Sequence, residues 1–187
     1  MKAGMIRETF PFKHLVSIFA ALIVLSALSV HAAPLRTVTA TITKISDGDT
    51  VQAITREGTK LKVRLYGIDA PETKKGDVLG EPFSKESMER LAFLIYRKSV
   101  KIDIIDIDRY RRMVGIIWLK DANVNLEMIK AGMAEAYVEY LKEPYRNVFI
   151  QAEREAKARG KGIWSQGSSY ERPSQFRKKK GIGGTEK

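Results

Sequence analysis

Residues 63–72, VRLYGIDAPE, lead an apolar strand directly into a turn that holds charged side chains of both signs. In the overlapping segment KLKVRLY, residues 60–66, apolar residues alternate with lysine and arginine, which is the pattern of a strand with one buried face. Arg64 lies on the polar face of this strand, where its charged head can reach solvent or a ligand. Asp69 and Glu72 follow it closely. Unlike charges this near a core strand need a reason beyond packing.

Four further segments have the composition of strands. RTVTATITKI (36–45) and TVQAITR (50–56) precede the opening stretch, and SVKIDIID (99–106) and MVGIIWL (113–119) follow it. Five short strands with a helix before the last pair predict an α+β protein that is mainly β. The expected architecture is a five-stranded OB-fold β-barrel with three helices, because a strongly twisted sheet removes its edges by closing. An open α+β sheet is the alternative.

The three helices are predicted from apolar stripes and end signals. One runs from about Pro82 to Arg97, with proline in its first turn. The second, 123–132, has an asparagine cap at its start and Gly132 at its end, and the third, 147–160, repeats that pattern.

The N-terminal segment has the organisation of a secretion signal. Three cations precede an apolar run from Leu15 to Val30, and small residues around Ala32 suit peptidase cleavage. Residues 1–32 are therefore predicted to be a cleaved signal peptide, and the product to be exported to a periplasm or the medium. No second apolar run follows, so no stable membrane association is expected after cleavage; an uncleaved anchor is the alternative.

The rest of the chain is expected to hold one domain. Residues 33–166 form the predicted OB-fold domain, which we expect to be a monomer. Residues 167–187 lose apolar periodicity and end in a run of basic residues. They are predicted to be a mobile basic tail.

Composition excludes several kinds of chemistry. The chain has no cysteine, and its two histidines, His14 and His31, both lie in the predicted leader. The domain therefore lacks the groups for Ser-His-Asp or Cys-His catalysis and for zinc sites built on nitrogen or sulfur. The net charge of +11 falls to +9 when the leader's three cations and single glutamate are removed. Such a basic domain favours polyanions such as nucleic acid.

Two acidic turns could form one oxygen-rich site. Asp47 and Asp49 lie in SDGDTV (46–51), and Asp69 and Glu72 lie in GIDAPE (67–72). If both turns lie at the same end of the barrel, their carboxylates suit a hard cation such as calcium. The hairpin segment DRYRR (108–112) adds arginines to Arg64. A cation bound by oxygen, a further carboxylate and arginines are what phosphodiester hydrolysis requires, because its transition state gathers negative charge.

Five motifs together resemble the staphylococcal nuclease family. They are SDGDTV, VRLYGIDAPET, DRYRRMVG, NVNLEMIKAGMA and AKARGKGIWS, and the similarity covers residues 36–165. The resemblance implies a calcium-dependent OB-fold endonuclease that cleaves DNA and RNA by direct attack of water and leaves 3′-phosphate ends.

The resemblance also implies roles for individual residues. Asp49 and Asp69 match the calcium-binding aspartates, and Ala70 matches a residue that offers its backbone carbonyl to the metal. Arg64 matches the arginine that holds the phosphate, and Glu72 matches the general base. The other matches are Arg112 as the second transition-state arginine, and Arg109 and Tyr140 as substrate-binding residues.

Three positions depart from the family pattern. Ala70 stands where the best-known member has threonine, which removes a hydroxyl but keeps the carbonyl. Arg111 replaces a glycine of the D-x-Y-G-R hairpin, and arginine adopts positive φ less readily than glycine. Val138 stands where a nucleotide-stacking tyrosine is expected, and Tyr137 either compensates or packs in the core.

Two other functions are compatible with parts of the sequence. A noncatalytic OB-fold module could bind nucleic acid without cutting it, although such a module has no need for Glu72 beside a metal site. A glycosidase could use a pair of the carboxylates. The basic charge and the presence of only two tryptophans argue against the glycosidase.

Overall fold

A computed structural model describes residues 34–74 and 76–181 of the chain. The predicted signal peptide, residues 1–32, lies outside the described residues. None of the helices within the described ranges is both long enough and apolar enough to cross a membrane.

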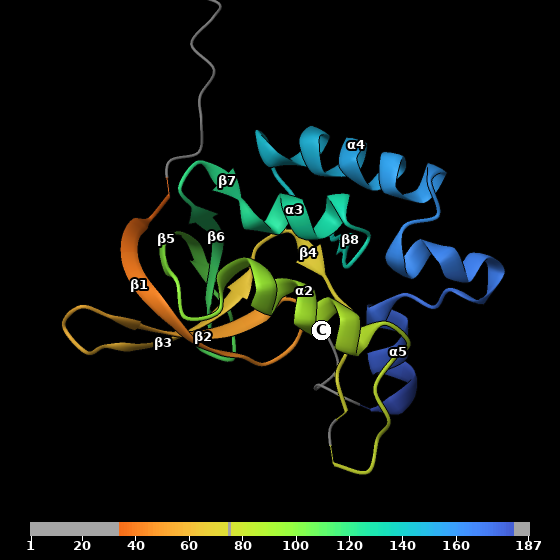
Figure 1. Cartoon of the computed structure of the whole chain (residues 1–187), viewed down its shortest axis with the longest axis horizontal. Coiled ribbons are helices and arrows are strands. Elements are labelled where there is room, and N and C mark those ends of the chain that lie inside the picture. The colour runs from red at the N-terminus through yellow and green to blue at the C-terminus, as the bar shows by residue number, and fades with distance from the viewer. Residues whose placement is uncertain (1–33, 75, 182–187) are drawn as a thin grey trace, which may run out of the picture. The chain divides into compact units, whose positions relative to one another are not determined.

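The described residues contain a closed β-barrel (Figure 1). Its strands are β1 (Arg36–Ile45), β2 (Thr50–Thr55), β3 (Lys60–Leu65), β5 (Ser99–Ile107) and β6 (Met113–Leu119). Antiparallel pairs join them in the order β3-β2-β1-β5-β6. Parallel pairing of β3 with β6, with Arg64 opposite Val114, closes the ring. The predicted five-stranded OB-type barrel is confirmed, and the open sheet is wrong.

Alternation along the strands fills the barrel. In β3, Leu61, Val63 and Leu65 are buried, whereas Lys60 and Lys62 are exposed and Arg64 is half-buried. The interior is rich in β-branched residues, among them Ile42, Val51, Ile102 and Ile116. These side chains suit a pleated surface with one buried face, so burial of this face sets the strand register.

The three predicted helices are present, with small differences in their ends. They are α2 (Ser84–Ile95), α3 (Val124–Lys130) and α4 (Tyr145–Ala158). The Asn123 side chain accepts a hydrogen bond from the Leu126 amide at 3.1 Å, so the predicted cap of α3 is confirmed. The predicted cap of α4 is wrong: this helix begins two residues earlier, and Asn147 bonds to Glu143 instead.

A buried asparagine fastens α3 to the barrel. Asn125 is fully buried, and its amide donates to the carbonyls of Tyr66, at 2.9 Å, and Gly115, at 3.1 Å. Its oxygen accepts from the Ile117 amide at 3.0 Å. Since α3 also packs against α4, these three bonds place both helices relative to β3 and β6 (Figure 1).

One short strand extends the barrel sheet, and two others form a separate two-stranded sheet. β7 (Ala122–Asn123) pairs with β6, and β4 (Ile68–Asp69) pairs with β8 (Glu135–Ala136). The β4–β8 ladder sets Asp69 opposite Glu135. This pairing joins the acidic turn after β3 to the chain segment that follows α3.

The prediction of a mobile tail is wrong for residues 167–181. After α4 the chain forms the 3₁₀ segment η1 (Gly162–Ser169) and then the helix α5 (Pro173–Lys180). Proline occupies the first turn of α5, and Gly181 ends it at φ 63°, which are favourable start and stop residues. Phe176 is buried, so α5 packs on the domain. A single apolar residue in a basic segment was too weak a pattern to predict this helix.

Candidate active site

The two acidic turns meet at one arginine. Arg64 Nη1 lies 2.7 Å from Asp49 Oδ2, and Arg64 Nη2 lies 2.9 Å from Asp69 Oδ1. Asp49 comes from the turn between β1 and β2, whereas Asp69 lies in β4, directly after β3. Both aspartates are buried. The structure thus brings together Asp49, Arg64 and Asp69, three of the four residues that the resemblance assigned to metal and phosphate.

The backbone holds this arrangement in place. The Asp49 carbonyl accepts from the Leu65 amide at 2.8 Å, which ties the first turn to the end of β3. The Asp49 carboxylate accepts from the Ala70 amide, at 3.1 Å, and from the Thr50 hydroxyl, at 2.9 Å. Asp49 therefore spans both turns through a network in which its oxygens are satisfied.

The glycine of SDGD is required by close packing. A Cβ atom on Gly48 would lie 1.9 Å from the Ser87 hydroxyl oxygen and 2.7 Å from the Ala70 Cβ. The first acidic turn can therefore approach α2 and the second turn only because position 48 has no side chain. This close approach places Asp49 beside Ala70.

Charge pairing outweighs burial at Asp49 and Arg64. Burial opposes the charge on Asp49, but Arg64 and the hydrogen bonds outweigh it, so the pKa of Asp49 lies below its ordinary value. The same pairing raises the pKa of Arg64 against the effect of burial. Asp47 behaves differently: burial, together with the neighbouring charge of Asp49, raises its pKa to about 8. A protonated Asp47 would not compete with Asp49 for a cation.

Glu72 is held by a second glutamate that sequence analysis missed. The Glu72 amide donates to Glu81 Oε2 at 2.6 Å, and the Glu81 amide donates to the Glu72 carbonyl at 2.9 Å. Glu81 is buried, and burial raises its pKa to about 7. The 71–81 loop is thus closed on itself at the residue proposed as the base. No sequence motif marked Glu81, because its partner is a backbone group.

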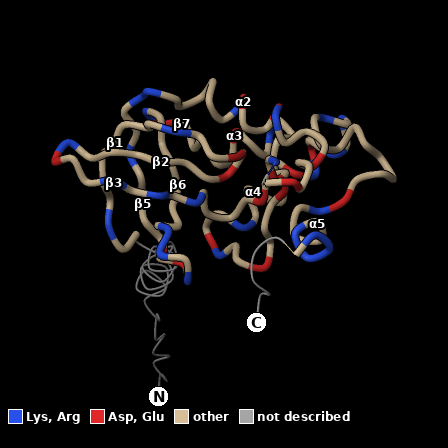
Figure 2. Tube along the Cα trace, turned by 90° about the horizontal axis from the view of Figure 1, so that it is seen from below, with Lys and Arg blue, Asp and Glu red and all other residues tan. Residues whose placement is uncertain are grey.

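An arginine from the C-terminal helix completes the described cluster. Arg177 Nη1 lies 2.9 Å from Asp69 Oδ1 and 3.0 Å from Glu72 Oε1, and its Nη2 lies 2.9 Å from Asp69 Oδ2. Its guanidinium therefore binds Asp69 through both carboxylate oxygens. Figure 2 shows the basic α5 beside a gathering of acidic positions. Sequence analysis missed Arg177 because it lies in the segment predicted to be a tail.

The 108–112 hairpin forms its own pair of charges. Arg112 Nε lies 2.6 Å from Asp108 Oδ2, and the Tyr110 and Arg112 amides both donate to Asp108 Oδ1 at 2.9 Å. Within the described residues Arg112 pairs with Asp108 and not with the aspartates of the acidic turns. Arg111 has φ 60°, the left-handed conformation that the family glycine would adopt. Arg111 therefore holds a backbone conformation that is strained for a residue with a Cβ atom.

The predicted substrate-binding residues lie on the surface. Arg109 is exposed, and its guanidinium lies 5.0 Å from the centre of the Tyr110 ring. Tyr140 is 53% exposed, and its ring packs edge-on against Tyr137 with centroids 4.6 Å apart. Tyr137 itself is buried, which favours the packing role for that residue.

The donor groups fit a hard cation, but they do not form a complete cage. Asp49 and Asp69 offer carboxylate oxygens, and calcium and magnesium prefer oxygen ligands. Within residues 34–74 and 76–181 no three acidic, imidazole or thiol side chains lie together in a way that could hold a metal ion. A cation here would therefore need backbone, water or phosphate oxygens as further ligands, as an Ala70 carbonyl could supply.

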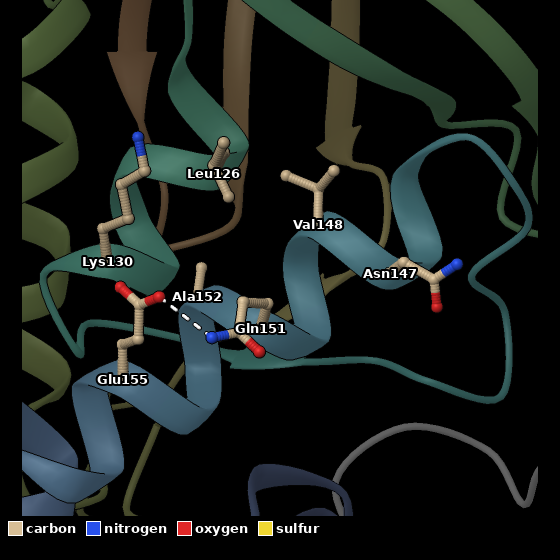
Figure 3. A pocket seen from close by; sticks show the side chains of 7 residues that line it. All are labelled: Leu126, Lys130, Asn147, Val148, Gln151, Ala152 and Glu155. Atoms are coloured by element: carbon tan, nitrogen blue, oxygen red, sulfur yellow. Dashed lines mark hydrogen bonds between the residues drawn. The ribbon is translucent and has the colours of Figure 1, made fainter.

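A surface pocket lies apart from these residues. It is found between α3 and α4 and is lined by Leu126, Lys130, Asn147, Val148, Gln151, Ala152 and Glu155 (Figure 3). None of the residues assigned to metal, phosphate or base contributes to it. We place the candidate active site at the acidic turns, where charged groups from four chain segments converge.

The fold and this site together define an OB-barrel protein with a paired-aspartate and arginine centre. A family comparison matches residues 62–166 to the family described as Staphylococcal nuclease homologue. An endonuclease of Haemophilus influenzae described as uncharacterized is 38% identical over 144 residues, which cover 77% of this chain and 75% of that protein. A micrococcal nuclease of Shigella flexneri is 32% identical over 70% of this chain and 75% of that protein.

The matching region also occurs in longer proteins. A probable staphylococcal-like nuclease of Oryza sativa is 39% identical over 64% of this chain, but the match spans only 29% of the rice protein. The extent of the family match and the identity to the bacterial relatives show that this chain belongs to the staphylococcal nuclease family. Membership supports an endonuclease function.

Proposed function

We propose that this chain is a calcium-dependent, sugar-nonspecific nuclease that hydrolyses phosphodiester bonds of DNA and RNA and leaves 3′-phosphate ends. The observation that carries the proposal is the meeting of Asp49 and Asp69 on the single guanidinium of Arg64. Family membership supports the reaction class. The basic charge of the chain supports a polyanionic substrate.

The proposed metal ligands are Asp49, Asp69 and the Ala70 carbonyl. A calcium ion bound there would offset phosphate charge and lower the pKa of a bound water. Ala70 contributes through its backbone, so the absence of the family threonine hydroxyl leaves this ligand in place. The lowered pKa of Asp49 keeps its carboxylate ionised and able to bind a cation.

The remaining residues act on the phosphate and on water. Arg64 would hold a phosphate oxygen, and Arg112 would add a second positive charge as the transition state becomes more negative. Glu72 would accept a proton from the attacking water. Arg109 and Tyr140 would bind substrate at the surface. Since Arg112 is paired with Asp108 at 2.6 Å, this role requires it to turn toward the phosphate when substrate binds.

A cleavage assay tests the proposal. Purified chain is incubated with plasmid DNA or with RNA, in calcium and then in excess chelator. We expect fragmentation of both substrates in calcium alone, and product ends that accept label only at a 5′-hydroxyl. Intact DNA with shifted mobility in both conditions would reject the nuclease and leave a noncatalytic binding module.

A matched pair of variants tests the metal site. Asp69→Asn removes a carboxylate of the proposed site, whereas Asp121→Asn removes an exposed carboxylate in the turn after β6. We expect Asp69→Asn to lose calcium-dependent cleavage and Asp121→Asn to keep it. Equal activity of the two variants would reject the assignment of Asp69.

Export and a monomeric state complete the proposal. They rest on the leader pattern of residues 1–32 and on the single predicted domain. Cell fractionation and N-terminal sequencing test export: recovery of a product beginning at Ala33 outside the cytoplasm is expected. Light scattering tests the monomer, and a mass of twice the chain would reject it.

A further inference from the structure

Arg177 occupies the oxygens that a cation at Asp69 would use. One guanidinium nitrogen binds Asp69 Oδ1 at 2.9 Å, the other binds Asp69 Oδ2 at 2.9 Å, and the first also reaches Glu72 at 3.0 Å. The Arg177 side chain is only 17% exposed. Arg64 already binds Asp69 Oδ1. Two arginines therefore contact both carboxylate oxygens of Asp69, so a metal ion bound to either oxygen would lie against a guanidinium.

The position of Arg177 is built into the fold. Its helix, α5, is anchored by the buried Phe176, the residue just before Arg177. The segment leading into α5 is bound as well: the Tyr170 hydroxyl donates to Glu135 Oε2 at 2.8 Å, and Arg172 Nε donates to Glu135 Oε1 at 3.0 Å. The helix is thus held by an apolar contact within it, at Phe176, and by polar contacts just before it, at Tyr170 and Arg172.

The charged anchor lies next to the site itself. Glu135 belongs to β8 and is paired with Asp69 of β4 in the short ladder. The C-terminal segment therefore binds neighbouring acidic residues on two adjacent strands, with Arg172 on one and Arg177 on the other.

We propose that Arg177 is a tethered competitor of the divalent cation, so that α5 lowers the metal affinity of the site. This inference rests on the proposed function, because it takes Asp69 as a metal ligand. A cation and the guanidinium each need the Asp69 oxygens, and their charges repel at this distance. Binding of one therefore excludes the other, and the apparent affinity falls in proportion to the fraction of molecules in which Arg177 has left.

Calorimetric titration with calcium, without nucleic acid, tests the competition. The full chain is compared with Arg177→Gln and with Lys178→Gln, which removes the same charge from an exposed position of the same helix. We expect Arg177→Gln to bind calcium about tenfold or more tightly than the unmodified chain. Lys178→Gln should change the dissociation constant less than about twofold, because only a screened charge is lost.

Two more variants test whether a change in calcium affinity comes from the Arg177–Asp69 contact or from a loss of folding. Arg177→Lys keeps the charge but loses the two-pronged bond, so an intermediate affinity is expected. Phe176→Ala keeps Arg177 but weakens the apolar anchor, and it should also tighten calcium binding. Circular dichroism shows whether each variant keeps the barrel. If Arg177→Gln fails to fold, Phe176→Ala decides: unchanged calcium affinity in a folded Phe176→Ala protein overturns the proposal.

The outcomes distinguish this inference from the proposed function. Equal calcium affinity of the unmodified chain, Arg177→Gln and Lys178→Gln overturns the competition but leaves the calcium site. Absence of calcium binding in all three proteins overturns the calcium site and the competition together. Tighter calcium binding in Arg177→Gln but not in Lys178→Gln supports both the calcium site and the competition.

Discussion

The barrel turns and the C-terminal helix deliver charge to the same place by different means. The turns place Asp49, Arg64 and Asp69 through backbone bonds within the closed barrel and through one close approach at Gly48. The helix places Arg177, which lies 108 positions after Asp69 in the sequence, through the buried Phe176 and a few polar contacts. Groups fixed by the barrel are suited to catalysis, whereas groups held by few contacts can be displaced.

This contrast carries a chemical consequence. Arg64 and Arg177 bind the same carboxylate, yet only Arg64 is tied to a barrel strand that cannot leave without unfolding. Removal of charge from the barrel turns should therefore abolish the reaction, and removal of charge from the helix should not. Four predictions test this difference, in order of decreasing expected effect.

Replacement of the proposed base tests the catalytic side of the comparison most strongly. Glu72→Gln should lower kcat by about 10²- to 10⁴-fold and largely preserve DNA affinity, because an amide cannot accept the proton of water. Single-turnover cleavage and a filter-binding assay measure the two properties. A near-normal rate for Glu72→Gln would reject Glu72 as the base. For comparison, Arg177→Gln at saturating calcium should cleave at a rate close to that of the unmodified chain.

Replacement of the barrel arginine should have the next largest effect. Arg64→Ala should lose about 10²- to 10³-fold in kcat even at saturating calcium, because it removes a positive charge aimed at the phosphate. Activity is measured over a calcium series. Full recovery at high calcium would mean that Arg64 acts only on the metal site, and its proposed role would be wrong.

Loss of the Asn125 anchor of α3 should destabilise the protein more than loss of the Phe176 anchor of α5. Asn125→Ala removes the partner of the Ile117 amide and of the Tyr66 carbonyl, whereas the Gly115 carbonyl keeps its bond from the Tyr66 amide. The loss should cost about 3 kcal/mol in the free energy of unfolding. Phe176→Ala should release α5 locally and change global unfolding by less than about 1 kcal/mol. Urea unfolding followed by circular dichroism measures both. Equal losses would show that α5 and the barrel unfold as one unit.

The smallest effect concerns the loop that carries Glu72. The pKa of Glu81 rises from 4.5 to about 7 on folding, chiefly through burial, so the folded state keeps a proton that the unfolded state loses between these values. Its contribution to stability is therefore fully present below about pH 4.5 and is lost as the pH rises through about 7. Glu81→Gln, which keeps an oxygen for the Glu72 amide, should flatten the decrease in Tm over this interval. Thermal unfolding in chelator measures it, and identical slopes for both proteins would contradict the prediction.

Much of the fold was predictable because it depends on local pattern. Alternation in KLKVRLY predicted the buried face of β3, and the Asn123 cap was found where α3 begins. The start of α4 was not predictable from Asn147. An asparagine in the first turn of a helix looks the same in the sequence as an asparagine that caps it, and Asn147 is the third residue of α4. The short strands β4, β7 and β8 carried no pattern of their own, since two residues are too few for alternation.

The candidate site was predictable only in part. Asp49 and Asp69 stood out as carboxylates in two turns beside strand-like segments, and Arg64 stood out as a cation close to the second turn. Glu81 and Arg177 did not, because each belongs to a segment whose composition is ordinary for a charged surface. What distinguishes them is the partner, a backbone amide for one and two buried carboxylates for the other.

From the sequence alone came the barrel strands, the absence of thiol and imidazole chemistry outside the predicted leader, and the residues that match a phosphodiester site. The strands and the excluded chemistry depend on periodicity and residue type, which are properties of short segments, whereas the roles of the site residues came from the resemblance to the nuclease family. Only the tertiary structure decided that a basic C-terminal segment folds into a helix and binds Asp69 and Glu72. That outcome depends on burial and charge pairing between groups more than a hundred positions apart, which no local pattern encodes.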